Sequence, residues 1–439
     1  MTKFIFIVFI FLFVCIITLI SILLIFLSIH FMGYNLFDLT EPESEQVSSP
    51  FYYVATSGNN NNTGLSPDHA WKTPSYAVDQ VKAGDTIYLL DGIWEKEHLY
   101  FKTNGTVEKP ITLKAYNGTP TLDGVYNSGT CITIDSELSK NYTNAIGYIN
   151  IEGIKITRYS HGIEMKEVHH IKFNNIDVGP CSTTCITFHD CQYCDLKNSN
   201  MHDTKWNTIA IMTAREHVHH ITIENCTIHG NPGTWGGDKS HGLIDLFNVH
   251  NTDNYSLTDI NIIGNEIYDA KLPAIFTHGL DNYHMYRFNI SNNIIHDSYG
   301  VTVSYFEDSI IANNTLYNQY PWGFYTCPPV KIHDNVTFIG NNVSVKSDGI
   351  EYWLSPDKEA DILITKDKSP YFRVDSKTVI IQDNERSSFT IETNYGGKII
   401  LQFTDGRKFS ENGKGTVEYY SDYSEYVTNG DEKVDISTN

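Results

Sequence analysis

A short pattern of alternating apolar residues recurs along the middle of the chain and constrains the fold more than any other feature. Each copy has two alternating apolar residues, a gap, a polar or small residue and a further apolar residue. The copies are INIEGIKI (149–156), IKFNNIDV (171–178), CDLKNSNM (194–201), ITIENCTI (221–228), INIIGNEI (260–267), FNISNNII (288–295), IIANNTL (310–316) and VTFIGNNV (336–343). Aligned on one shared position, successive copies lie 22, 23, 27, 39, 28, 21 and 27 residues apart. A minimum period near 21 residues, built from short β segments, is typical of a solenoid.

The repeat predicts an all-β, right-handed parallel β-helix. A second apolar segment follows each copy: GIEM (162–165), CITF (185–188), TIAI (208–211), GLID (242–245), AIFT (274–277), GVTV (300–303), GFYT (323–326) and GIEY (349–352). No 3.6-residue apolar periodicity spans ten residues here, which excludes helical repeats. Coils of a β-helix pair at about 4.8 Å, so equivalent residues form rows. One row is expected to be a structural ladder of hydrogen-bonded amides: Asn265, Asn293, Asn314 and Asn341.

A short helix is predicted to cap the first coil. Thr73 suits the N-cap, Pro74 the first helical position and Gly84 the C-terminal stop. Such a helix shields the core and blocks growth at the open end. Strands of the first coils are expected at 85–90, 98–101, 111–116 and 130–134, and the β-helix as a whole at 51–365.

The 21-residue pattern stops near residue 366. The segments TVIIQ, SFTIET, KIILQFT and GTVEYY then predict antiparallel strands. Residues 366–439 are therefore expected to form a small β-sandwich-like domain, and a C-terminal cap of the same solenoid is the alternative.

An apolar run from Phe4 to Phe31 is long enough to span a bilayer as a helix and longer than the apolar part of a typical signal peptide. Lys3 precedes the run and acidic residues follow it, which favours a cytoplasmic N-terminus. We expect residues 1–35 to be a single-pass transmembrane signal-anchor of the cell membrane and residues 36–50 a polar tether, with the bulk of the chain extracellular. A cleaved signal sequence is the alternative.

The charge balance argues against nucleic acid as a partner. The chain has 31 Lys and Arg against 52 Asp and Glu, a net charge of −21, whereas nucleic-acid binders need a basic face. Ten Asn-x-Ser/Thr sequons predict a glycoprotein if the chain is exported: Asn61, Asn104, Asn117, Asn141, Asn225, Asn254, Asn289, Asn313, Asn335 and Asn342.

Four of the eight cysteines are crowded together: Cys181, Cys185, Cys191 and Cys194. One or two local disulfides or free buried thiols are expected. A zinc site is a weaker alternative, because only one half has a suitable Cys-x2-Cys spacing.

The stretch FYYVATSGNNNNTGLSPDHAWKTPSYAVDQVKAGDTIYLLDGIW (51–94), with KPITLKAYNGTPTLDG (109–124), resembles the N-terminal region of secreted pectate-lyase-like β-helix proteins, especially polysaccharide lyases of family nine. The resemblance implies a β-helix and a polysaccharide substrate. The superfamily also contains hydrolases, epimerases and surface proteins with no known reaction, so the fold does not define the activity. Family-nine lyases use a lysine base and an aspartate-bound calcium, but their motif does not map residue by residue onto this chain.

The turn before each second apolar segment is the predicted functional face, because it is charged and aromatic and one copy carries an insertion. Coil alignment places three rows there. They are His202, His229, Tyr268, His296 and Tyr317; then Asp203, Asp269 and Asp297; then Lys205, Lys239 and Lys271. The insertion adds Trp235, Asp238 and His241.

These residue types suit β-elimination from a uronic acid, which needs a cation to neutralise the carboxylate and a base to take the neighbouring proton. Lys239 is the predicted base, and His241, Lys205 and Lys271 are further catalytic candidates. Asp203, Asp238 and Asp269 are the predicted ligands of a possible calcium ion. Substrate binding is assigned to Trp235, His202, His229, Tyr268 and His296.

Other interpretations of this face stay open. A glycoside hydrolase would use two of the carboxylates, and a non-catalytic surface protein would only bind glycans. Asp, His and Lys are also ordinary residues of solvated turns. The pairs His169–His170 and His219–His220 are predicted to be plain surface turns at another corner, and Asp245 falls at an inward strand position.

Overall fold

The computed structural model describes residues 50–126, 129–136, 145–231, 241–248, 256–278, 285–326, 332, 334–346, 349–355, 362–374, 378–393, 398–405, 407, 409–412, 416–419, 424–427 and 432–438. The predicted anchor and tether lie outside these residues, as do Trp235, Asp238 and Lys239. Among the described helices, none is long and apolar enough to span a membrane.

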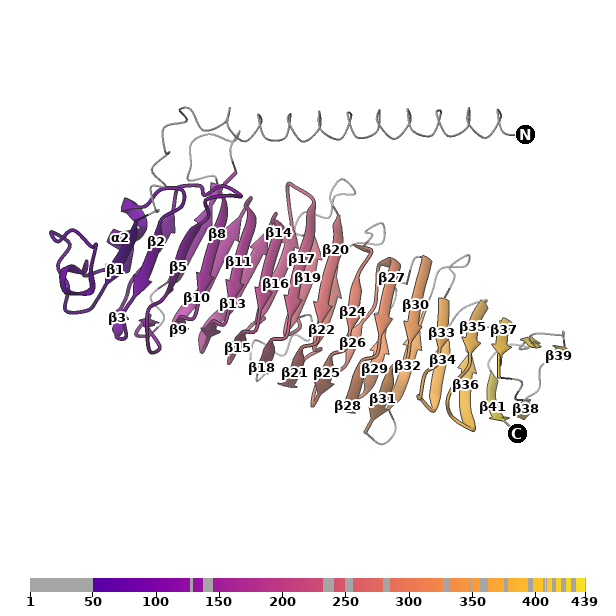
Figure 1. The fold of residues 1–439 in the computed structure, drawn as a ribbon. Helices are drawn as coiled ribbons and strands as arrows, with labels where there is room; N and C mark the ends of the chain where they lie inside the picture. Colours follow the sequence, from indigo (N-terminus) through magenta and orange to yellow (C-terminus); the bar gives the residue numbers. More distant parts are fainter. Residues whose placement is uncertain are drawn as a thin grey trace, which may run out of the picture. The chain divides into compact units, whose positions relative to one another are not determined.

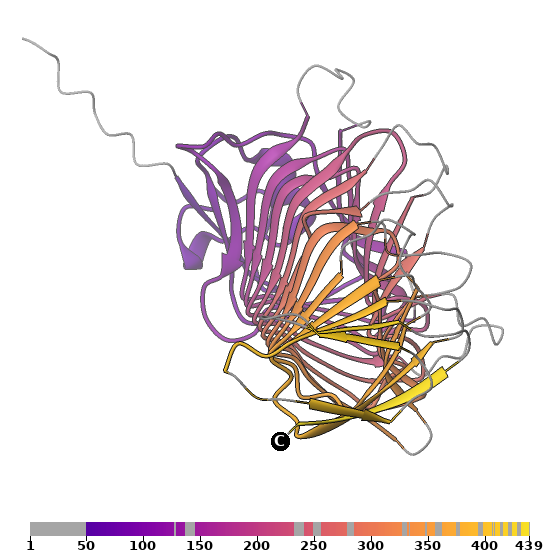
Figure 2. The same cartoon turned by 90° about the vertical axis from the view of Figure 1, so that its right-hand side faces the viewer.

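Residues 50–439 form one compact unit of stacked coils, each of which contributes strands to up to three sheets (Figures 1 and 2). Within a coil the chain passes through sheet A, then sheet B, then sheet C. Strands of successive coils pair in parallel, for example β8 with β11 and β11 with β14. The predicted parallel β-helix is therefore present.

The strand bounds are as follows. Sheet A contains β1 (Phe51–Val54), β2 (Thr86–Leu89), β5 (Ile111–Ala115), β8 (Gly147–Glu152), β11 (His169–Asn174), β14 (Gln192–Lys197), β17 (Val218–Glu224), β20 (Leu257–Ile263), β23 (Met285–Tyr286), β24 (Asn289–Ser291), β27 (Phe306–Ala312), β30 (Asp334–Ile339), β33 (Ile362–Thr365), β35 (Thr378–Gln382), β37 (Lys398–Gln402), β39 (Thr416–Tyr419) and β40 (Ser424–Val427). Sheet B contains β3 (Ile93–Glu95), β6 (Thr121–Asp123), β9 (Lys155–Thr157), β12 (Asp177–Val178), β15 (Asn200–His202), β18 (Thr227–Asn231), β21 (Glu266–Ala270), β25 (Ile294–His296), β28 (Thr315–Gln319) and β31 (Asn342–Val345). Sheet C contains β4 (Leu99–Phe101), β7 (Thr130–Asp135), β10 (Tyr159–Lys166), β13 (Cys181–His189), β16 (Ile209–Thr213), β19 (Ile244–Asn248), β22 (Ile275–His278), β26 (Val301–Thr302), β29 (Trp322–Tyr325), β32 (Ile350–Leu354), β34 (Tyr371–Val374), β36 (Ser388–Thr393), β38 (Phe409–Asn412) and β41 (Glu432–Thr438).

The first coil is capped as predicted. After a short 3-10 helix η1 (Pro67–His69), the α-helix α2 covers Pro74–Gln80. The Thr73 hydroxyl accepts a hydrogen bond from the Tyr76 amide, and Ala77 and Val78 are buried against the core. The apolar face of α2 thus covers the core at the β1 end (Figure 1).

The predicted asparagine ladder runs through the interior between sheets A and B. The Asn341 side-chain oxygen accepts hydrogen bonds from the Asn314 backbone amide and side-chain amide, both at 3.0 Å. The same pair of bonds joins Asn314 to Asn293 and Asn293 to Asn265. Each ladder asparagine also donates to a carbonyl of sheet A, as Asn341 does to Ile311 at 2.9 Å. The ladder therefore satisfies turn amides that the apolar core would otherwise leave unpaired.

The strands after residue 366 differ from the expected antiparallel arrangement. β33, β35 and β37 pair in parallel in sheet A, and β32, β34 and β36 do so in sheet C. Antiparallel pairing involves only β38 to β41 with their neighbours. Within the described residues sheet B has no strand after β31, and the coils are shorter: Thr365, Gln382 and Gln402 are in register at steps of 17 and 20 residues. A repeat shorter than the preceding ones no longer shows in the sequence as the same pattern.

Six cysteines among the described residues carry free, buried thiols, and these include the four crowded ones. Burial raises the pKa of the Cys185 and Cys191 thiols well above the ordinary value. The sequence left local disulfides and free buried thiols as alternatives, and the described cysteines are free thiols. They pack as small apolar side chains.

The ladder predicts unequal costs for two adjacent substitutions. Asn341→Ala removes the acceptor of two Asn314 donors and the donor to Ile311, so we expect it to lower the free energy of unfolding by about 2–4 kcal/mol. Asn342→Ala, at an exposed neighbouring position, is the matched control and should cost less than about 0.5 kcal/mol. Thermal and urea unfolding of both variants measures the difference. Equal destabilisation would contradict the structural role of the ladder.

Candidate functional site

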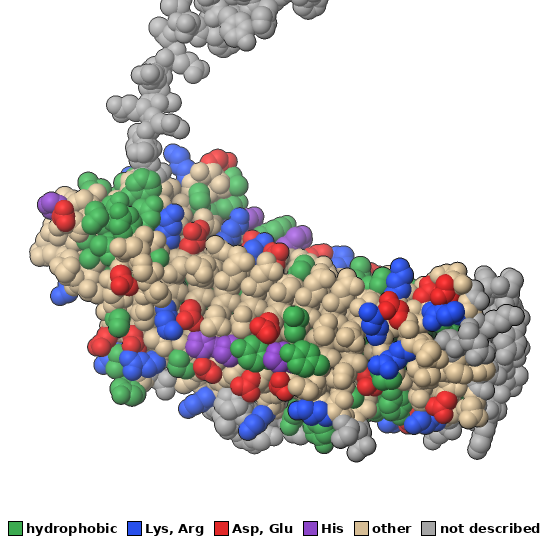
Figure 3. Space-filling model, turned by 60° about the horizontal axis from the view of Figure 1, so that its bottom comes forward, with side chains coloured by type: hydrophobic (Ala, Val, Ile, Leu, Met, Phe, Trp, Pro, Cys, Tyr) green, Lys and Arg blue, Asp and Glu red, His purple; other side chains and the backbone are tan. Residues whose placement is uncertain are grey.

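The predicted ring row is present on sheet B. His202, His229, Tyr268, His296 and Tyr317 are in register on successive strands. Neighbouring ring centroids lie 5.4, 4.8, 4.8 and 4.6 Å apart, with interplanar angles of 10° or less. Figure 3 shows this row of histidine and hydrophobic side chains with carboxylates on both sides. The three inner rings, His229, Tyr268 and His296, are stacked on both sides, so only their edges point to solvent. Along its middle the row can thus offer a ligand ring nitrogens and hydroxyls, but not stacking surfaces.

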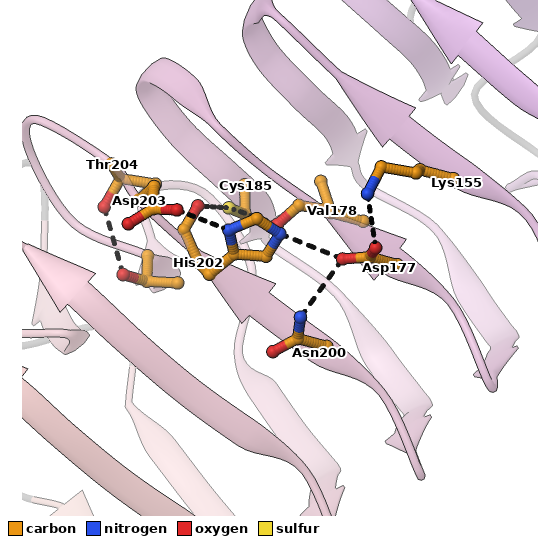
Figure 4. Close-up of polar contacts among 9 residues, drawn as sticks. Lys155, Asp177, Val178, Cys185, Asn200, His202, Asp203 and Thr204 are labelled. Atoms are coloured by element: carbon orange, nitrogen blue, oxygen red, sulfur yellow. Dashed lines mark hydrogen bonds and ion pairs between the residues drawn. The ribbon is translucent and has the colours of Figure 1, made fainter.

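His202 is the most strongly bonded member of the row. Its Nδ1 lies 2.7 Å from the Asp203 carboxylate and its Nε2 lies 2.9 Å from Asp177, which in turn pairs with Lys155 at 2.8 Å (Figure 4). The Asp177 hydrogen bond raises the pKa of His202 above its ordinary value, against the effect of burial. Burial alone would raise the pKa of Asp177, but the bonds from His202 and Lys155 outweigh it and lower that pKa to about 2.

The carboxylates of the second row occupy positions that the backbone itself selects. Asp203, Asp269 and Asp297 have φ of 55°, 54° and 50°, and Gly230 takes the same place in its coil with φ of 75°. Asp and Gly tolerate this left-handed conformation better than most residues. A side chain on Gly230 would meet the Asp203 carboxylate, since a Cβ there would lie 2.4 Å from Oδ1. Asp203 therefore leans over the next coil, in the direction of Asp269.

A pocket of about 380 Å³ lies at the turn between sheets B and C, which we name the B–C turn. It is lined by Tyr126, Arg158, Pro180, Cys181, Ser182, Asp203, Thr204, Lys205 and Gly230. The Arg158 guanidinium forms an ion pair with Asp123 and lowers the pKa of that carboxyl. The pocket thus combines Lys205, an Arg158 that also lies over the Tyr126 ring, and the Asp203 carboxylate, a set of groups that suits an acidic sugar.

The B–C turn at residues 203–208 links this pocket to a buried carboxylate. Asp245 in β19 is fully buried, and its Oδ2 lies 2.8 Å from His241 Nδ1 and 3.2 Å from Asn207 Nδ2. Trp206 packs edge-to-face against His241 with ring centroids 5.2 Å apart. The inward position predicted for Asp245 is wrong by one residue. Its strand neighbours Ile244 and Leu246 point into the core, so Asp245 lies on the outer face of sheet C, in register with Ala210, and is buried there. An imidazole held by a buried carboxylate has a fixed orientation, which is the arrangement that general acid–base chemistry requires.

The structure brings some of the predicted site residues together and leaves others apart. Lys205 lines the pocket, and His241 adjoins the same turn through Trp206. Asp269 and exposed Lys271 lie two coils from Asp203 and Lys205, or about 10 Å along the stack. Trp235, Asp238 and Lys239 fall outside the described residues, in the segment that joins Asn231 to His241.

Sequence reasoning missed Asp177, Arg158, Tyr126 and Trp206 as members of the site. The sequence contained a signal for Trp206 and Arg158, because both residues are located in the charged and aromatic turns next to the predicted rows. Asp177 had none, since its position in sheet B is outward in every coil and most residues there are ordinary surface residues.

A calcium site is not complete in the described part of the chain. No three His, Cys, Asp or Glu side chains are grouped there in a way that could hold a metal ion. The Asp203 carboxylate lies over Gly230, Asp269 occupies the equivalent corner of the next coil, and the third predicted ligand, Asp238, is among the residues not described.

The fold and this turn define the chain as a pectate-lyase-like parallel β-helix protein. A sequence profile of the chondroitinase B family matches residues 70–355, which is well over half of the 439 residues. The chain therefore belongs to the chondroitinase B family, a family of polysaccharide-lyase-like β-helix proteins. No curated protein sequence matches it.

Solved structures share the fold at low sequence identity. Pectate lyase Pel9A is 16% identical with a TM-score of 0.48, over 69% of this chain and 78% of that one. A glycoside hydrolase is 11% identical with a TM-score of 0.50, over 81% and 95%. A family PL6 polysaccharide lyase from Pseudopedobacter saltans is 14% identical with a TM-score of 0.46, over 70% and 82%. At these identities the likeness concerns the fold alone.

The His202–Asp177 pair predicts a pH-dependent contribution to stability. The raised pKa of His202 means that its contribution is complete below its unfolded value of 6.5 and is lost as the pH rises through the folded value. The lowered pKa of Asp177 means that its contribution is present above its unfolded value of 3.8 and is lost as the pH falls toward about 2. The pair therefore stabilises the fold most between these two unfolded values.

Asp177→Asn should lower the free energy of unfolding by about 1–2 kcal/mol at pH 5 and by less at pH 8.5, because the contribution of His202 is lost as the pH rises through its folded pKa. Urea unfolding at both pH values measures this. Asp269→Asn, which alters an exposed carboxylate, is the control and should have little effect at either pH. A loss that is the same at both pH values would contradict the assignment.

Proposed function

We propose that this protein is an extracellular lyase that cleaves a uronic-acid-containing polysaccharide by β-elimination at the B–C turn. The observation that carries the proposal is the pocket of Arg158, Asp203 and Lys205, built by the same turn that holds the buried Asp245–His241 pair. Membership of the chondroitinase B family supports the reaction class.

Elimination requires a group that moves a proton and a cation that steadies the carboxylate beside it. We assign the proton transfer to His241, because Asp245 engages Nδ1 and fixes the ring. Lys205 is assigned to the substrate carboxylate, because it lines the pocket. Lys239, the base predicted from the sequence, lies two residues before His241 and is the competing assignment, and Lys271 is a further cation beyond Asp269.

Calcium is proposed as the cofactor, held by Asp203 and Asp269 together with Asp238. When bound it would neutralise the uronate carboxylate. The charge of this face supports the need for a cation: Asp177 and Glu266 flank the ring row on one side, and Asp203, Asp269 and Asp297 flank it on the other. A polyanion alone would be repelled there.

The test is incubation of the full chain with pectate, alginate and chondroitin in the presence of calcium, with detection of the unsaturated product by ultraviolet absorbance. His241→Gln should lower kcat by about 10²-fold or more, and Asp245→Asn should lower it through loss of ring orientation. The matched controls, His69→Gln and Lys172→Ala, alter exposed residues and should leave kcat unchanged, while Lys205→Ala should raise KM. Chelation should abolish activity and added calcium should restore it.

Three outcomes would overturn parts of this proposal. Full activity in His241→Gln with none in Lys239→Ala would transfer the base role to Lys239. Release of reducing ends without ultraviolet absorbance would favour a glycoside hydrolase, which would use two of the carboxylates of this face. Glycan binding without any product would favour the non-catalytic surface protein.

The apolar run at residues 4–31 supports a second, separate proposal, that the protein is a single-pass membrane protein with the β-helix outside the cell. The full chain should remain in the membrane fraction after alkaline carbonate washing, and a chain lacking residues 1–35 should not. Recovery of the full chain in the wash would contradict the anchor.

A further inference from the structure

The tetrapeptide Val-His-His-Ile occurs twice, at residues 168–171 and 218–221. Both copies lie in sheet A, at the start of β11 and of β17. They are away from the B–C turn, which follows sheet B, and the proposed reaction uses neither copy.

The local backbone turns both histidines of each pair outward. Consecutive residues of a regular strand point to opposite faces, so a His-His pair would normally be split. Here Val168 and Ile171 both point inward and are buried, and so do Val218 and Ile221. Both histidines of each pair therefore lie between two inward residues. The second histidine has a φ of 53° in one copy and 55° in the other. This left-handed residue, which recurs as Tyr148 and Tyr193 in neighbouring coils, places the two neighbouring imidazoles on the same side.

The two pairs have nearly the same geometry. Nδ1 of His169 lies 2.9 Å from Nδ1 of His170, and Nδ1 of His219 lies 2.9 Å from Nδ1 of His220. The rings are almost perpendicular, at 88° and 82°. Two imidazole nitrogens that each lie about 2.1 Å from one metal ion are roughly 2.9–3.4 Å apart for angles between 90° and tetrahedral. The observed spacing is that of two ligands on a single ion.

A ring of the intervening coil separates the two pairs. Gln192 is in register with both His169 and His219. The Tyr193 ring stacks between His170 and His220, with centroid distances of 4.8 and 4.6 Å. The pairs are two coils apart, about 10 Å, so each would act as a site of its own.

The electrostatic setting favours neutral imidazoles, the form that binds metal. Burial, and then the neighbouring imidazole, lowers the pKa of His169 and of His219. Burial also lowers the pKa of His170. The charge of Lys172 lowers this pKa further, and the charge of Asp195 raises it. Asp259 opposes the lowering at His219 but is itself engaged by Arg287 at 2.7 Å.

We propose that each His-His pair is a binding site for one divalent transition-metal ion, copper(II) or zinc, through both Nδ1 atoms, with water completing the coordination. The Nδ1 proton now shared between the rings moves to Nε2 of the donor ring, so no net proton is released. In the described part of the chain no third His, Cys, Asp or Glu completes a protein-only ligand set. The ions are therefore exchangeable, and copper binds more tightly than zinc.

The test is calorimetric titration of the tag-free full chain with CuCl2. His170→Asn and His220→Asn are suitable variants because asparagine tolerates a positive φ. Each single variant should lose one equivalent of copper and the double variant two. The control His69→Gln should lose none, and the double variant should keep its unfolding temperature. Electron paramagnetic resonance of the copper-loaded protein should show coupling to two imidazole nitrogens per ion.

Unchanged copper stoichiometry in the double variant, with the fold intact, would overturn the proposal, and so would a spectrum with one nitrogen per ion. The outcome is independent of the proposed lyase activity, since neither pair contributes to the B–C turn. The double variant should cleave polysaccharide as the unaltered chain does if the lyase proposal holds.

Discussion

Parallel pairing between successive coils is the constraint on which every other feature of this protein depends. Strands inside sheets A, B and C exchange backbone hydrogen bonds with the coils before and after them. A residue inserted into such a strand would turn the outward side chains on one side of the insertion inward. Length variation is therefore confined to turns. The segment that joins Asn231 to His241 is such a variation, and it falls between a sheet B strand and the next sheet C strand. Chemistry that differs from coil to coil can be added there without disturbing the core.

The left-handed backbone at the corners of the coil is a second, weaker constraint, and the residues that it selects resemble those of a functional site. Where a strand ends in a left-handed residue, Asp, Asn or Gly is preferred whatever the protein does. Asp203, Gly230 and Asp269 all occupy this position on successive coils. A carboxylate at the corner therefore does not by itself indicate a metal site, and the calcium proposal depends on the chelation experiment. Residues that the backbone does not require carry more weight, and fully buried Asp245 is the strongest of them.

The sequence was sufficient to predict which residues form rows, but not the side-chain contacts that join one row to another. Register follows from the repeat, so the ring row and the asparagine ladder could be predicted from spacing alone. The His202–Asp177 bond could not, because it joins two different outward rows through side-chain conformation. Nor could the Asp245–His241 contact, because the spacing of the repeat places Asp245 one residue out of register and His241 belongs to a turn. The coils after residue 366 were missed because their repeat is shorter.

The ring row and the B–C turn make different demands on a ligand. The inner rings of the row have both faces covered, and carboxylates flank the row on both sides, so its middle offers an acidic sugar neither a stacking surface nor an attractive charge. The turn offers Tyr126, Arg158 and Lys205 around one pocket. A uronic-acid chain is therefore expected to cross the B–C turn and not to follow the row along sheet B. In this arrangement the stacked rings serve as a support: they hold His202, and through it Asp203, at the edge of the pocket.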